Sequence, residues 1–157
     1  MSAVGLDLSQ HVINAVVAHV LRWGRPPRAV LAVTDEELRG HLGEELRARG
    51  LEVLEAEHAR TLHTAVRCAL TWPKTESIDL FVLDAELEGC SPLHAIAFAR
   101  SRNLASPAIL LTDESDPLSG ADVAGLDLCS RTHACEAIDR SLLRALRRRW
   151  SERPAAA

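Results

Sequence analysis

Short, largely apolar runs alternate with stretches of helical periodicity along most of the chain. Five runs predict strands, at 29–33, 51–54, 78–83, 108–111 and 126–129. Between them, apolar residues recur every three or four positions and predict helices at 36–49, 59–71, 92–102 and 134–150, with a shorter, weaker one at 117–124. This alternation favours a doubly wound parallel sheet. Two strand orders fit, the flavodoxin-like order 2-1-3-4-5 and half of a Rossmann sheet. The turn at 33–37 has no glycine, which argues against a pyrophosphate loop.

An additional amphipathic helix is predicted at 7–23, with Asp7 as its cap and the Pro26-Pro27 pair as a stiff link to the first strand. Its apolar stripe consists of Val12, Ile13, Val16, Val17, Val20 and Leu21. This stripe needs a cover, which is the chain's own domain, a second copy in a homodimer, or a partner's groove. We divide the chain into a helix and linker at 1–27, a main domain at 28–150, and a flexible tail at 151–157.

Composition and charge narrow the classes of function. The 157 residues are 47% hydrophobic and 25% charged, as in one ordinary globular domain. The formal net charge of −4 argues against a nucleic-acid partner, so we interpret the arginines of 140–153 as a solvated helix end. No apolar run is long enough to cross a membrane and no signal peptide is recognisable, so we expect no membrane insertion. The four scattered cysteines are expected to be reduced thiols in a cytoplasmic protein.

Polar residues follow the predicted strands at their carboxyl ends, where ligands bind in open parallel sheets. Asp35 follows the first strand, Asp84 the third, Thr112 the fourth and Arg131 the fifth. In the flavodoxin-like order the first and third strands are neighbours, so the two carboxylates are expected to face each other. Such a pair is tolerated when a hard cation or a basic side chain lies between its members.

Residues 84–93, with the sequence Asp-Ala-Glu-Leu-Glu-Gly-Cys-Ser-Pro-Leu, resemble the loop after the phosphate-accepting aspartate of bacterial two-component receiver domains. The resemblance extends over about 28–150 and implies the CheY-like, flavodoxin-like order 2-1-3-4-5. It also implies that Asp84 is the phosphoacceptor, that Asp35, Asp84 and the Glu86 carbonyl hold Mg²⁺, and that the Thr112 hydroxyl contacts the phosphoryl group. A histidine kinase is the partner that this resemblance implies.

The chain departs from the family pattern at four positions. Thr34 replaces the first acid of the acidic pair, Arg131 the lysine, Thr132 the proline after it, and Leu128 the aromatic switch residue. The single lysine, Lys74, is expected at the other end of the third strand. Arg131 either contacts a phosphoryl oxygen or pairs with Asp84 and masks it.

We therefore expect an atypical receiver, not an enzyme, that signals through protein–protein contacts without phosphorylation, with Mg²⁺ weakly bound or absent. The alternative is a phosphorylatable single-domain response regulator, with Asp84 as phosphoacceptor and Mg²⁺ held by Asp35. The helices at 7–23, 117–124 and 134–150 are its expected docking surfaces.

Two other chemistries are disfavoured. A phosphatase of the haloacid-dehalogenase type needs a second aspartate two residues after the nucleophile, where this chain has Glu86. Cys129, His133 and Cys135 are metal-ligand types, but no fourth ligand follows at zinc spacing.

Overall fold

The computed structural model describes residues 3–73, 77–104, 106–113 and 126–151. Its centre is a parallel sheet in the order β2-β1-β3-β4-β5, which confirms the predicted flavodoxin-like fold. The strands are β1 (Arg28–Ala32), β2 (Glu52–Ala56), β3 (Leu80–Asp84), β4 (Ala108–Thr112) and β5 (Leu126–Ser130). The predicted helix at 117–124, Lys74 and the tail from 152 onward lie outside the described residues.

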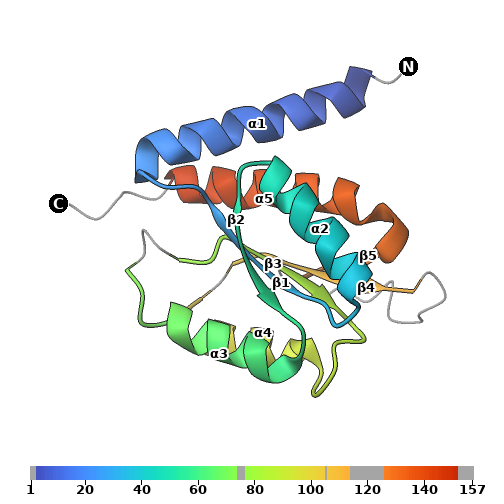
Figure 1. Ribbon diagram of the computed structural model, residues 1–157. Helices are drawn as coiled ribbons and strands as arrows, with labels where there is room; N and C mark the ends of the chain where they lie inside the picture. Colours follow the sequence, from blue (N-terminus) through green and yellow to red (C-terminus); the bar gives the residue numbers. More distant parts are fainter. Residues whose placement is uncertain (1–2, 74–76, 105, 114–125, 152–157) are drawn as a thin grey trace.

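Helices cover both faces of this sheet (Figure 1). On one face lie α2 (Glu36–Ala48) and α5 (Ala134–Ser151), and on the other lie α3 (Ala59–Ala69) and α4 (Pro92–Ser101). A short 3₁₀ helix, η2 (Arg131–His133), joins β5 to α5. Every residue of β3 and β4 is buried, because a central strand of a doubly wound sheet is covered on both sides.

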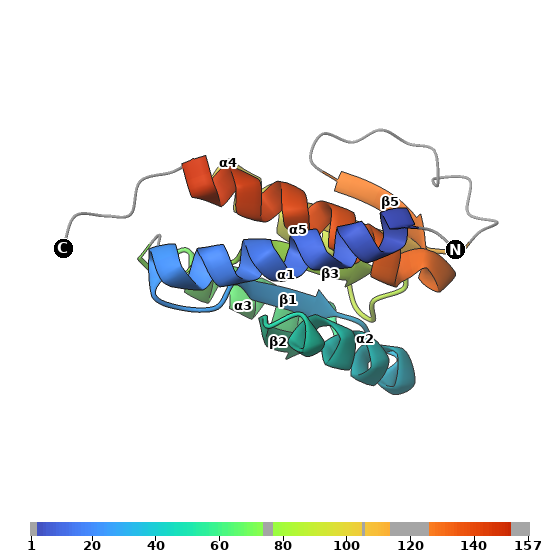
Figure 2. The same cartoon turned by 90° about the horizontal axis from the view of Figure 1, so that it is seen from above.

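The additional helix, α1 (Ala3–Trp23), packs lengthwise on α5 as a further layer (Figure 2). It begins before Asp7, so the prediction that Asp7 caps this helix is wrong. Val12 and Val16 are buried in the core that α1 shares with α2 and α5. Gly50 adopts φ +93°, a conformation that favours glycine, and a Cβ there would lie 3.0 Å from Val16 Cγ1, so the turn after α2 disfavours any side chain at this position.

The main domain of the same chain covers only one side of the apolar stripe on α1. Val12 and Val16 face inward, whereas a second row of apolar side chains remains exposed. This exposed α1 row consists of Ile13, Val17, Val20 and Leu21, and Leu21 is 81% exposed. In the described part of the chain, no helix is long and apolar enough to span a bilayer.

A buried ion pair joins α5 to the start of β3, beneath the end of α1. Arg149 Nε lies 3.2 Å from Asp79 Oδ1, and both side chains are at most 6% exposed. The other Asp79 oxygen accepts a 2.9 Å hydrogen bond from the backbone amide of Arg28. The Arg149 guanidinium also lies 4.2 Å from the Trp23 ring centroid. The interpretation of the C-terminal arginines as a solvated helix end is therefore wrong for Arg149, although Arg147 and Arg148 are exposed.

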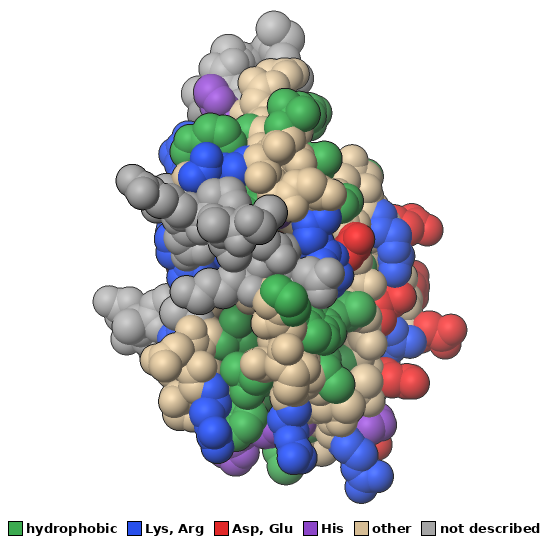
Figure 3. Space-filling model, turned by 90° about the vertical axis from the view of Figure 1, so that its left-hand side faces the viewer, with side chains coloured by type: hydrophobic (Ala, Val, Ile, Leu, Met, Phe, Trp, Pro, Cys, Tyr) green, Lys and Arg blue, Asp and Glu red, His purple; other side chains and the backbone are tan. Residues whose placement is uncertain are grey.

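Surface charges surround the start of β2, at the end of the molecule where α1 and α5 terminate. Glu52 accepts hydrogen bonds from Arg25 at 2.8 Å and from Arg28 at 3.0 Å. The Arg28 guanidinium also lies 4.7 Å from the Trp72 ring centroid. Figure 3 faces this end of the molecule and shows basic side chains interspersed with apolar ones.

Candidate functional site

Neighbouring strands place three of the predicted site residues at the carboxyl edge of the sheet. Asp84 ends β3 and pairs in register with Leu111, the residue before Thr112 at the end of β4. Thr112 pairs with Ser130, the last residue of β5, and Arg131 follows directly in η2. The strand order thus brings together a carboxylate, a hydroxyl and a guanidinium that are far apart in the sequence.

Arg131 holds the Asp84 carboxylate by two parallel hydrogen bonds. Arg131 Nε donates to Asp84 Oδ2 at 3.0 Å, and Nη2 donates to Oδ1 at 2.6 Å. The remaining nitrogen, Nη1, donates to Asp113 Oδ1 at 2.6 Å, while Glu86 lies 3.6 Å from Nη2. The hydrogen bonds with Asp84 raise the pKa of the Arg131 guanidinium above its ordinary value against the effect of burial, and the three carboxylates raise it further. The guanidinium is therefore a permanent cation.

Asp84 is nearly inaccessible in this arrangement. Only 5% of the residue is exposed, and Oδ1 also accepts a 2.8 Å hydrogen bond from the backbone amide of Glu86. Both carboxylate oxygens are thus engaged by donors within the chain. A nucleophile needs a free lone pair directed at its electrophile, so Arg131 must move before Asp84 can react.

The side chains of Asp35 and Glu86 make contacts other than with Asp84, although the predicted Mg²⁺ ligand at Glu86 is its backbone carbonyl. Asp35 is exposed and caps α2, with its Oδ1 accepting a 2.9 Å hydrogen bond from the Leu38 amide. The Glu86 side chain is 73% exposed and leans toward Arg131. Among the described residues, the side chains of Asp35, Asp84 and Glu86 do not form a group with all ligand atoms within 4.8 Å of one another. Their oxygen atoms suit Mg²⁺ by type, but the arrangement does not fit the ion while Arg131 holds Asp84.

Thr34, which stands in place of the first acid, fastens two loops instead. Its Oγ1 donates to the Glu57 carbonyl at 2.7 Å and accepts from the Glu88 amide at 2.8 Å. The Glu88 carbonyl in turn accepts a 2.8 Å bond from the Ala59 amide. The β3–α4 loop is therefore pinned against the β2–α3 loop, and a carboxylate at position 34 is unable to donate the first of these bonds.

Thr112 ends β4 beside the site, and Leu128 lies within β5, three residues before Arg131. Thr112 is 1% exposed, and its Oγ1 lies 3.5 Å from the Cys129 carbonyl, at the outer limit for a hydrogen bond. Its hydroxyl is thus directed toward β5. Leu128 packs against the apolar core under α3 and α4. An aliphatic side chain there has no hydroxyl or ring with which to follow a change at Thr112.

Two functional contacts escape the sequence reasoning. Asp113 is the second carboxylate partner of Arg131, and its position directly after the β4 strand is the signal that would have identified it. The Thr34 hydroxyl has no such signal, because its partners lie on loops that only the folded chain brings together.

Comparisons with known proteins identify the class of fold. No protein-family model matches the sequence, and no curated protein matches it. Solved structures match well. A response regulator receiver domain from Clostridium thermocellum superposes with a TM-score of 0.64 at 17% identity, covering 79% of this chain and 97% of that one. The receiver domain of Francisella response regulator 1452 gives 0.62 at 14% identity, covering 78% and 98%.

A third match is the receiver domain of a putative NarL response regulator from Mycobacterium tuberculosis, with a TM-score of 0.57 at 20% identity, covering 75% of this chain and 97% of that one. The chain therefore has the fold of response regulator receiver domains, as the residues at 84–93 predict. Structural matches at identities this low show the shared fold alone, and the chemistry of this sheet edge depends on the side chains present here.

Proposed function

We propose that the chain is an atypical receiver-like signalling protein, not an enzyme, that acts by binding other proteins in a two-component type of pathway without being phosphorylated. The observation that carries this proposal is the paired hydrogen bonding of Arg131 with Asp84. The receiver fold supports the signalling context, and the occupied carboxylate supports a state that does not depend on phosphoryl transfer.

Arginine masks Asp84 better than lysine would. A guanidinium offers several donors in a fixed plane and matches both oxygens of a carboxylate at once. Asp113 holds the third nitrogen, which fixes the orientation of the group. Arg131 also neutralises the charge of Asp84, which weakens the attraction of this edge for a divalent cation. Masking and the loss of an acid at Thr34 therefore act in the same direction.

The chain acts on another signalling protein. In addition, the exposed α1 row favours a homodimer, in which a second copy of the chain covers this row. The apolar side chains of Ile13, Val17 and Leu21 stand in the solvent on a helix that already buries its other face. Exposed apolar rows of this kind mark contact surfaces, and two copies of one helix form a self-complementary pair.

The four cysteines are free thiols, which supports a location in the reducing cytoplasm.

The second candidate is a phospho-switch loaded by a histidine kinase. Its support is that Asp84 keeps its place at the end of β3, with the Thr112 hydroxyl at the end of the next strand. Arg131 is 20% exposed and its outer anchor, Asp113, is 64% exposed, so the guanidinium has a route away from the site. In this case Asp84 becomes the phosphoacceptor, and Asp35 holds Mg²⁺ after Arg131 has moved.

One experiment separates the two candidates. The full chain is incubated with Mg²⁺ and acetyl phosphate, and its intact mass is measured beside that of a receiver domain known to accept phosphate from this donor. We expect no phosphoryl adduct on the chain while the reference domain is labelled. An adduct that is present in the wild type and absent in Asp84→Asn would overturn the phosphorylation-independent proposal and establish the phospho-switch.

A further inference from the structure

A second group of ligand-type side chains lies away from Asp84, between α2 and the first turn of α5. It consists of His41 and Glu45 on α2 and Cys135 on α5, with one ligand atom of each within 4.8 Å of the others. His41 and Glu45 are four residues apart, so one face of the helix presents both. Cys135 follows His41 by 94 positions and Glu45 by 90 in the sequence, and only the packing of α5 beside α2 brings it to this face.

Arg49 holds Glu45 and α5 in place beside this group. Arg49, directly after α2, donates to Asp139 on α5 at 2.6 Å and to Glu45 at 3.0 Å. The first bond fixes the end of α2 against α5, and the second sets the direction of the Glu45 carboxylate. A cation bound near Glu45 competes with Arg49, but Arg49 retains Asp139 in that case. Arg49 therefore keeps α2 against α5 through Asp139, and it must release Glu45 when a cation binds.

The donor set selects a particular kind of metal. A thiolate, an imidazole and a carboxylate together suit zinc, whereas Mg²⁺ and Ca²⁺ prefer oxygen alone. Ligand atoms around tetrahedral zinc lie roughly 3.5 Å apart, given metal–ligand bonds of about 2.0–2.3 Å. The three groups must therefore close by about an ångström from a separation of up to 4.8 Å. His41 is exposed and Cys135 only partly buried, so both side chains have room to turn inward.

We propose that His41, Glu45 and Cys135 form a zinc site that joins α2 to α5. On binding, the S–H bond of Cys135 breaks, its proton passes to the solvent, and the sulfur forms a bond to the metal. The His41 imidazole binds as a neutral ligand and Glu45 as a carboxylate. Three protein ligands leave the fourth tetrahedral position to a water molecule or to a side chain of a partner. This site shares no residue with the Asp84–Arg131 pair.

The test is a zinc titration of the full chain without an affinity tag, in competition with a chromogenic chelator. We expect one zinc ion per chain, and at least a tenfold loss of affinity in both His41→Ala and Cys135→Ser. The matched controls are His94→Ala, which removes another exposed histidine, and Cys129→Ser, which removes another partly buried thiol. Both controls are expected to keep the wild-type affinity within about twofold.

Cobalt substitution identifies the ligands directly. The wild type and Cys129→Ser are expected to show a thiolate-to-cobalt charge-transfer band, and Cys135→Ser is expected to lack it. Failure of the wild type to bind zinc saturably, or an unchanged affinity in His41→Ala and Cys135→Ser, would overturn the proposal. Because His41 is exposed, its alanine variant retains the fold and keeps the test decisive even where a change at Cys135 impairs folding.

Discussion

Arg131 and Asp84 form a pair with two hydrogen bonds across the end of the sheet, with Nε 3.0 Å from Oδ2 and Nη2 2.6 Å from Oδ1. β3 and η2 contribute one partner each, so the pair also ties the fifth strand to the third. The guanidinium bonds both carboxylate oxygens and so blocks the approach of an electrophile to Asp84. Changes at either residue test whether this contact is a mask, a structural bond, or both.

Exchange of the arginine for lysine is expected to open Asp84. Lysine offers one compact ammonium group, which is unable to hold both Asp84 oxygens and Asp113 together. In Arg131→Lys we expect a phosphoryl adduct from acetyl phosphate and Mg²⁺, detected by intact mass. The double variant Arg131→Lys/Asp84→Asn is the control and is expected to remain unlabelled. If Arg131→Lys stays unlabelled as well, the arginine is not what prevents the reaction.

Removal of the arginine side chain is expected to destabilise the chain more than a change of Asp84. Arg131→Ala leaves a carboxylate that is 5% exposed with the Glu86 amide as its remaining donor, at a cost of about 2–3 kcal/mol. Asp84→Asn leaves Arg131 with Asp113, at a cost of about 1 kcal/mol. Urea unfolding measures both values. Equal losses in the two variants would contradict this account of the pair.

The Thr34 hydroxyl is expected to contribute measurably to the stability of the two loops that it joins. Thr34→Val keeps the shape but loses the bonds to Glu57 and Glu88, at a cost of about 1–2 kcal/mol. Thr34→Ser retains the hydroxyl and is expected to remain within about 0.5 kcal/mol of the wild type. Chemical denaturation compares them. A valine variant as stable as the serine variant would show that the loops hold together without this hydroxyl.

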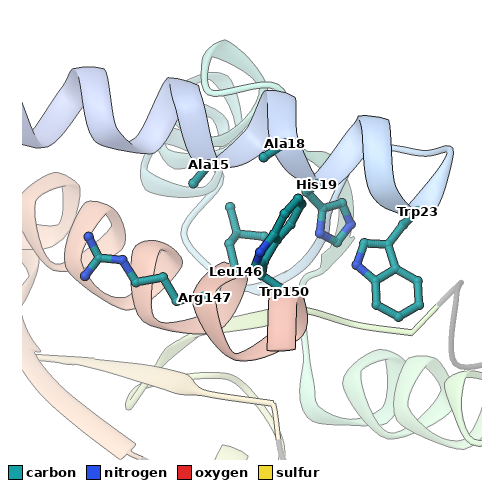
Figure 4. Close-up of a pocket in the computed structure, with 7 residues that line it drawn as sticks. All are labelled: Ala15, Ala18, His19, Trp23, Leu146, Arg147 and Trp150. Atoms are coloured by element: carbon teal, nitrogen blue, oxygen red, sulfur yellow. The ribbon is translucent and has the colours of Figure 1, made fainter. Parts of the chain in front are cut away.

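His19 is expected to make the chain less stable in mild acid. Burial, together with the charges of Arg149 and Arg25, lowers its pKa from 6.5 to about 4. Its Nδ1 is buried without a hydrogen-bond partner among the described residues, and its ring lies in the seam of α1 and α5, where it lines a cavity of about 140 Å³ (Figure 4). Between pH 6.5 and 4 the unfolded chain binds the proton and the folded chain does not, so stability falls as the pH falls.

The size of this effect follows from the two pKa values and reaches about 2 kcal/mol at pH 5. We expect His19→Leu to gain this amount over the wild type between pH 7.5 and pH 5, measured by denaturant unfolding at each pH. His11→Gln removes an exposed histidine from the same helix and serves as the control. A constant difference between His19→Leu and the wild type across this range would contradict the prediction.

Two adjacent valines of α1 are expected to respond differently to replacement by a charged residue, one in stability and the other in assembly. Val16 is 7% exposed and packs toward the core, whereas Val17 is 53% exposed in the outer apolar row. Val16→Asp is expected to lower the free energy of unfolding by about 3 kcal/mol or more. Val17→Asp is expected to leave stability nearly unchanged and to shift the chain from dimer to monomer in light scattering. A wild type that is monomeric at every concentration would contradict a homodimer through α1.

The fold could be predicted because the strands are short apolar runs separated by stretches of helical periodicity. The runs that become β1, β3 and β4 are largely apolar, as is typical of strands covered on both faces. Right-handed crossovers left two strand orders open, and the resemblance at 84–93 favoured the one that the structure has. The boundaries were less certain. β3 starts at Leu80, two residues later than predicted, because Asp79 instead pairs with Arg149 and the Arg28 amide. No local pattern distinguishes this buried acid from a residue of the strand.

The site could be predicted only as far as the backbone determines it. The ends of parallel strands meet at one edge, so Asp84, Thr112 and Arg131 were assigned to it correctly from the topology. Side-chain choices were not determined in this way. Whether Arg131 contacts Asp84, and whether His41 lies near Cys135, depends on rotamers and on how helices distant in the sequence pack. Tertiary packing determines these side-chain contacts, and hydrophobic periodicity predicts only secondary structure.

The two bonds of the Thr34 hydroxyl constrain how this protein can change over generations. An aspartate placed there would supply a missing acid, yet it would release the Glu57 carbonyl from its donor and leave Arg131 on Asp84. A second exchange at 131 alone would free the carboxylate without supplying the acid. Neither single replacement both frees Asp84 and supplies an acid at position 34, so two coupled changes separate this sheet edge from one that has both.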